Sequence, residues 1–157
     1  MTLRLLPDAE RCFSAFIRDD TDIAAAATDL GIDEVRCVTE WGRNQTFPAI
    51  KVTRIGGSPV GGHAYAAESV IVQVDVMGGN KLQTNGLAEA VRSGLMQNMN
   101  GRLTIGDVEF VAHRVIPGGI RPAPDPKRPG QDSTVTDSTS PASKPAVQFD
   151  VVAVLSV

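Results

Sequence analysis

The sequence lacks the features that mark membrane, secreted or metal-dependent proteins. No apolar run approaches the roughly 18 residues that cross a bilayer, and residues 1–7 are too short for a signal peptide. The two cysteines, Cys12 and Cys37, have no C-x-x-C spacing. We predict that both are reduced thiols packed as small apolar side chains, with a disulfide or a catalytic thiol as the alternative. We therefore expect a cytosolic protein with no membrane partner.

Basic residues are too few and too scattered for a protein that grips nucleic acid. The chain has 15 Lys and Arg against 18 Asp and Glu, a formal net charge of −3. Strong binding to phosphate needs a dense Lys and Arg stripe that displaces counterions, and the sequence has none. The composition thus disfavours a nucleic-acid-binding function.

Signals of catalysis are equally scarce. No serine stands in a Gly-x-Ser-x-Gly setting, and neither cysteine has a base nearby in sequence. His63 and His113 are fifty residues apart without neighbouring ligands, so we interpret both as surface or interface residues. We predict no enzyme, no cofactor and no metal site, although distant residues can still converge in space.

The residues that are present predict one α+β domain. Its seven aromatic side chains are few, so the core must be aliphatic. Periodicity predicts helices at 7–18, 19–30 and from 80 to beyond 95, and strands at 34–41, 47–55, 68–77, 108–116 and 146–157. We expect a mostly antiparallel sheet of four to five strands with two helices packed on one face.

Local signals refine the helices. Asn80 and Gln83 are spaced as a capping box at the start of the third helix, and Gly31 is placed to end the second. Gly86 weakens a helix by roughly 1 kcal/mol relative to alanine, which suggests close packing at that position.

Most of the proline lies in one segment. Seven of ten prolines fall within residues 117–145, which hold almost no apolar side chains and cannot form a core of their own. Because predicted strands of one sheet flank the segment, it is a long Pro-rich insert before the last strand. It is either a solvated surface loop or an arm that another subunit orders.

Three segments carry a resemblance to a known family: FPAIKVTRIGG (47–57), VIVQVDVMGG (70–79) and KLQTNGLAEAVRSGL (81–95). Together they resemble the tail terminator, or tail completion, proteins of long-tailed bacteriophages. The order of elements matches over roughly residues 8–116, and the final strand also fits. The 117–145 insert departs from the family pattern, and Met77 stands where an aromatic residue is common.

The resemblance implies a structural virion protein whose residues 1–157 form a single tail-terminator-like domain. Such proteins form a homo-oligomeric ring, usually a hexamer, that caps the completed tail tube and stops its polymerisation. The ring also provides the docking surface for the head connector or stopper protein, and DNA passes through its lumen without specific binding. The implied location is the head–tail neck of the virion, with assembly in the host cytoplasm.

Two segments are our candidates for subunit or inter-ring contacts. The glycine-rich stretch 56–66, predicted as a loop free to order on contact, supplies Gly56, Gly57, Pro59, Gly61, Gly62, His63 and Tyr65, and the insert supplies Ile120, Arg121, Lys127 and Arg128. The alternatives are another neck component (an adaptor or a stopper), a tail tube protein or, more remotely, a small-molecule-binding or enzymatic α+β domain.

Overall fold

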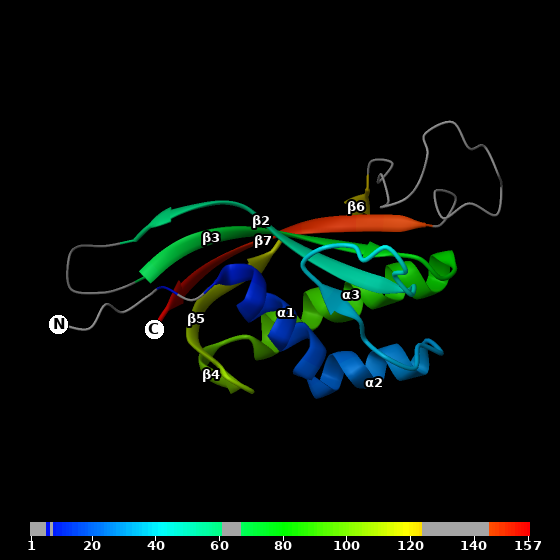
Figure 1. Cartoon of the computed structure of the whole chain (residues 1–157), viewed down its shortest axis with the longest axis horizontal. Coiled ribbons are helices and arrows are strands. Elements are labelled where there is room, and N and C mark those ends of the chain that lie inside the picture. Colours follow the sequence, from blue (N-terminus) through cyan, green and yellow to red (C-terminus); the bar gives the residue numbers. More distant parts are fainter. Residues whose placement is uncertain (1–5, 7, 61–66, 124–144) are drawn as a thin grey trace.

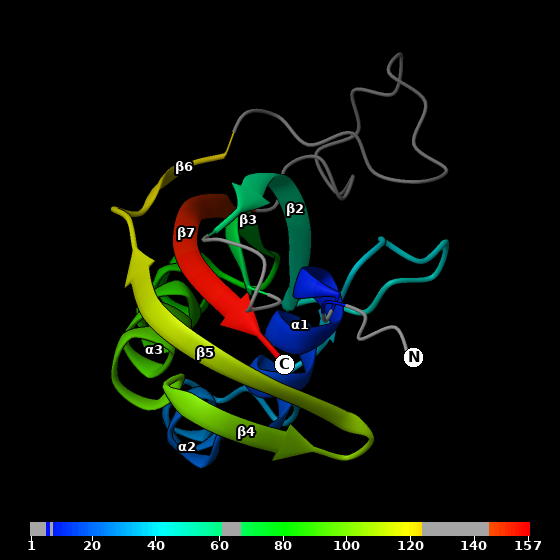
Figure 2. The same ribbon diagram turned by 90° about the vertical axis from the view of Figure 1, so that its left-hand side faces the viewer.

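One curled sheet with helices on its concave side makes up the fold (Figures 1 and 2). The computed structural model describes residues 6, 8–60, 67–123 and 145–157. The helices are α1 (Ala9–Asp19), α2 (Thr21–Asp29) and α3 (Lys81–Asn98); the strands are β1 (Cys37–Val38), β2 (Ala49–Pro59), β3 (Ala67–Met77), β4 (Gly101–Ile105), β5 (Val108–Pro117), β6 (Arg121–Pro122) and β7 (Ala146–Ser156). The predicted α+β class is confirmed.

The sheet is larger and more mixed than predicted. Its order is β1-β2-β3-β7-β5-β4, with β6 paired to β7, so seven strands replace the expected four to five. Every pairing is antiparallel except that of β1 with β2. The predicted strand 34–41 shrinks to two residues. The sequence analysis missed β4 and β6 because both are short, with five and two residues.

The predicted loop at 56–66 needs a similar correction. β2 continues through Gly56 and Gly57 to Pro59, paired with β3 as far as Glu68. Gly61, Gly62, His63 and Tyr65 lie outside the described residues. A bulge after Arg54 shifts the register, and such a shift lets two adjacent glycines sit within a strand.

Local sequence determines where the helices begin and end. Asp8 accepts hydrogen bonds from the backbone N–H groups of Glu10 and Arg11, and Asp20 ends α1 while its side chain caps α2. Gly31 ends α2 with a φ of +76°, while the N–H of Ile32 donates to the carbonyl of Ala27, as in a Schellman motif. The predicted capping box of Asn80 and Gln83 is present.

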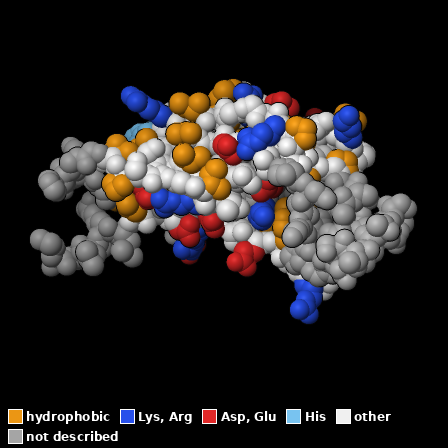
Figure 3. Space-filling model, turned by 90° about the horizontal axis from the view of Figure 1, so that it is seen from above, with side chains coloured by type: hydrophobic (Ala, Val, Ile, Leu, Met, Phe, Trp, Pro, Cys, Tyr) orange, Lys and Arg blue, Asp and Glu red, His pale blue; other side chains and the backbone are white. Residues whose placement is uncertain are grey.

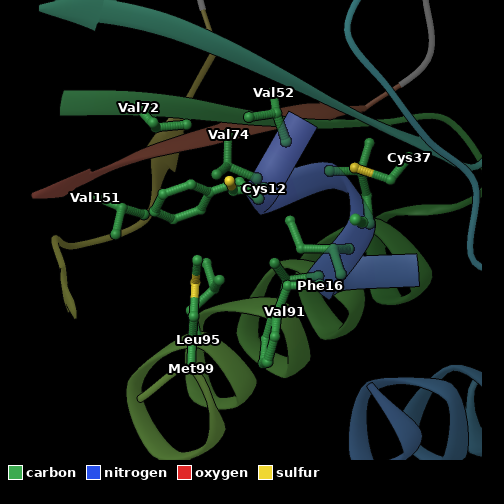
Figure 4. Packing of buried hydrophobic residues seen from close by; sticks show 14 of the residues in the cluster. Cys12, Phe16, Cys37, Val52, Val72, Val74, Val91, Leu95, Met99 and Val151 are labelled. Atoms are coloured by element: carbon green, nitrogen blue, oxygen red, sulfur yellow. The ribbon is translucent and has the colours of Figure 1, made fainter. Parts of the chain in front are cut away.

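The core lies between the concave face of the sheet and the helices (Figure 4). α1 and α3 pack on the sheet, as the prediction of two helices on one face requires, whereas α2 packs mainly against α3. The alternate valines of β3 and the aromatic rings of Phe13, Phe110 and Phe149 are buried. Burying each such side chain contributes roughly 1.5–3 kcal/mol. The cysteines also belong to this core, as predicted.

Candidate assembly surface

The candidate contact residues divide between two places. Gly56, Gly57 and Pro59 lie on the end of β2 that projects past the helices with β3 (Figure 1). Ile120 is half-buried against the core, and Arg121 lies on β6. Lys127 and Arg128, like Gly61, Gly62, His63 and Tyr65, lie outside the described residues.

The projecting hairpin depends on Gly57. Its φ of +145° is a conformation that side chains rarely adopt, and a Cβ there would overlap the carbonyl oxygen of Ser69 on β3. Arg54 and Glu68 form an ion pair across the same two strands. The hairpin is therefore a paired extension of the sheet rather than a free loop.

The outer edge of β2 is the one that faces away from β3. Backbone groups on this edge have hydrogen-bond partners as far as Arg54 and lack a strand partner in the described residues beyond it. Ile50 donates its N–H to the carbonyl of Arg36, and the N–H of Arg54 donates to the Glu10 carboxylate at 2.9 Å. A charged side chain at an edge strand prevents pairing with other strands. Past Arg54, no strand in the described part of the chain pairs with this edge.

The convex face of the sheet carries an apolar stripe that no helix covers (Figure 3). Ile71, Val152 and Ile116 are neighbours across β3, β7 and β5 in the strand register. Ile116 is 62% exposed and Val152 43%, and Ile55, in the β2 bulge, is 51% exposed. We call these four residues the outer stripe. Contiguous exposed apolar side chains of this kind mark interaction surfaces.

A bulge in β5 borders the outer stripe. The register with β7 shifts between His113 and Ile116, and Arg114 has a φ of +48°, the one positive φ at a non-glycine residue in the described chain. Glycine is the usual residue at such a bulge position. His113 and Arg114 are both exposed.

A polar network interrupts the same face at the root of the insert. Asp75, 8% exposed, accepts hydrogen bonds from the Gln73 amide. With its amide oriented to satisfy both neighbours, Gln148 donates to Asp75 and accepts from Arg121. Arg121 also pairs with Asp150 at 3.1 Å. Arg121 thus holds β6 to β7 within this chain.

Burial raises the pKa of Asp75; the Gln73 amide, Lys51 and Arg121 act in the opposite direction without cancelling it. A folded-state pKa above the unfolded value makes the ionised form unfavourable in the fold, and this penalty disappears as the pH falls through the raised pKa. We therefore expect acidification from pH 7 to about pH 4, near the ordinary aspartate pKa, to stabilise the wild type relative to Asp75→Asn. Urea unfolding at both pH values measures this, and the opposite trend would contradict the shift.

Other chemistry is sparse in the part of the chain that the structure describes. No three His, Cys, Asp or Glu side chains converge on a metal site there, and none of its helices has the length and apolar character of a membrane span. Burial raises the pKa of the Cys12 and Cys37 thiols to about 12, so neither is a reactive thiolate at neutral pH.

Sequence reasoning missed the outer stripe and the β5 bulge. A signal was present, because the face of β7 opposite the core residues includes Val152 and Val154 as well as polar residues. A solvated face of an antiparallel sheet is normally polar.

Comparison with known proteins adds no assignment to these surfaces. A scan against protein-family models matched no family, and a search of curated proteins found no relative.

Proposed function

We propose that this chain is the subunit of a ring that caps a completed bacteriophage tail tube, stops its growth and presents a docking surface to the head connector. The observation that carries the proposal is the uncovered convex face, where the outer stripe adjoins a projecting hairpin with an open edge. The resemblance of segments 47–57, 70–79 and 81–95 to tail terminators supplies the class of assembly.

The distribution of charge supports a ring through which DNA passes without being held. Most arginines of the described residues face a carboxylate within the chain: Arg11–Asp107, Arg36–Glu34, Arg54–Glu68, Arg92–Glu89, Arg102–Glu109 and Arg121–Asp150. Paired arginines contribute little to a positive field that would attract phosphate. We propose that the tube protein and the connector, rather than DNA, are its partners, in the virion neck.

Polymerisation of the cognate tube protein tests the proposal. We expect the purified chain to stop tube growth and to appear at one end of the tubes in negative-stain images. Val152→Lys, which places a charge in the outer stripe, is expected to weaken this capping by about thirtyfold, as loss of a central contact does. Leu82→Lys is the matched control, because Leu82 is 73% exposed on α3, away from the stripe.

Other outcomes favour the alternatives. Long tubes formed by the chain alone would identify a tube protein, and binding to the connector without binding to the tube would identify an adaptor or stopper. A monomer that ignores the tube and whose melting temperature rises with a small ligand would contradict the proposal in favour of a binding or enzymatic domain.

A further inference from the structure

A groove lies between two helices on the concave side of the sheet. α2 and α3 border a cavity of about 470 Å³, whose lining includes Asp22, Ala26, Asp29, Glu89, Ala90 and Ser93. Small side chains leave the groove open, and three carboxylates line it. Among the described residues Asp29 has no basic partner, and Glu89 meets Arg92 only at 3.9 Å. We call this feature the acidic groove.

The β5 bulge offers chemistry that complements the acidic groove. Arg114 is exposed and no carboxylate of the described chain pairs with it. Ile116, two residues further, is the most exposed member of the outer stripe at 62%. A branched apolar side chain and an unpaired guanidinium on the same strand suit a groove of small residues with carboxylates, because the charges are complementary.

The positive φ of Arg114 supports a functional role for its side chain. A residue with a Cβ at a φ of +48° is less stable there than glycine. Glycine would relax this strain but would remove the guanidinium. A strained residue on a surface is consistent with a function for that side chain.

The two surfaces belong to different elements of the fold. The acidic groove lies between two helices on the concave side of the curled sheet, whereas the outer stripe lies on the convex face (Figure 1). A contact between two different surfaces is heterologous, so it repeats from copy to copy and closes into a ring when the rotation allows.

We propose that the β5 bulge and outer stripe of one copy dock into the acidic groove of the next copy. This inference rests on the proposed function, because it names the contact that would join the subunits of the ring. Arg114 meets the groove carboxylates, while Ile116 and Val152 lie against its small side chains.

Two variants that each spoil one surface test the contact. One double variant, Ile116→Lys with Val152→Lys, places two charges in the outer stripe. The other, Asp22→Lys with Asp29→Lys, reverses two charges of the acidic groove. All four side chains are exposed, so the fold should survive, which circular dichroism checks. In sedimentation velocity, we expect the wild type to form rings and each variant alone to stay monomeric.

A mixture of the two variants gives the decisive result. Each retains one intact surface, so an equimolar mixture should form a dimer and nothing larger. Absence of that dimer, or rings from either variant alone, would overturn the docking proposal. Arg114→Gly should fold at least as well as the wild type yet associate about tenfold more weakly; unchanged association would also count against it.

Failure of the proposed function has a different signature. If the mixture gives dimers and the wild type gives rings that leave tube growth unaffected, the contact stands and the capping function falls. If wild-type rings stop tube growth while the mixed variants stay monomeric, the capping function stands and the contact falls. A wild type that is monomeric at every concentration overturns the contact directly.

Discussion

Replacing Gly57 with alanine is expected to detach the projecting end of the β2–β3 hairpin while the body of the domain stays folded. The new Cβ would overlap the backbone oxygen of Ser69, and the residue would have to hold a φ of +145°. A backbone atom cannot move aside as a side chain can, so we expect a local cost of about 2–3 kcal/mol. Hydrogen exchange of the Val60 amide, which donates to the carbonyl of Ala67 at 3.1 Å, measures it, and this exchange should accelerate.

Gly56 provides the matched control for this change. Its φ is ordinary, and an added Cβ would lie 3.5 Å from Ile71 Cδ1, a normal apolar contact. Gly56→Ala should therefore leave hydrogen exchange near the wild-type rate. If both variants cap tubes normally, the projecting hairpin is not part of the capping surface; if both lose the hairpin, the close approach at Gly57 is not the cause.

Substituting leucine for Gly94 on α3 is expected to lower the free energy of unfolding by about 3 kcal/mol. The Cβ alone would lie 2.6 Å from Ile23 Cγ1 of α2, and Ile23 is 1% exposed and so has little room to move. Forcing extra volume into such a contact costs roughly 1–3 kcal/mol, occasionally more. Urea unfolding of Gly94→Leu measures the loss.

A second substitution separates packing from other effects. Ile23→Ala alone should cost about 2–5 kcal/mol through the cavity it leaves. Combined with Gly94→Leu, the two losses should be less than additive, because the leucine fills the space that Ile23 vacates. Additive losses would rule out this explanation.

Gly86, eight residues or about two helical turns earlier in α3, should behave differently. Its added Cβ would lie 2.8 Å from the terminal methyl groups of Leu30 and 3.4 Å from its Cγ, and this half-buried side chain is flexible enough to move aside. Alanine also favours the helix by about 1 kcal/mol over glycine. Gly86→Ala should therefore be close to neutral.

Strong periodicity and local caps made much of the fold predictable. The alternating valines of VIVQVDVM specified β3, and Asn80 with Gln83 specified the start of α3. The suggestion of close packing at Gly86 is confirmed by its approach to Leu30. Gly94 approaches Ile23 of α2, a contact that depends on the tertiary arrangement and that local sequence does not specify.

The candidate surface was less predictable than the core. Gly56, Gly57 and Pro59 resemble a loop in sequence, because glycine and proline break strands unless a bulge or an edge accommodates them. Arg114 gives no signal of a positive φ, since arginine rarely adopts one. The acidic groove joins residues of two helices that are about sixty positions apart in sequence, and only the packing of α2 on α3 brings them together.

The residues at the two ends of the proline-rich insert are hydrogen-bonded to each other. The N–H of Ala123 donates to the carbonyl of Ala146 at 3.1 Å, beside the Arg121–Asp150 pair. The segment between Ala123 and Ala146 therefore begins and ends at one place on the sheet. Lengthening a loop whose ends are already held together costs little, about 0.6 kcal/mol of entropy for each doubling of its length. This junction is thus a natural insertion site, where a tag or a whole domain could be carried at the same position on every copy.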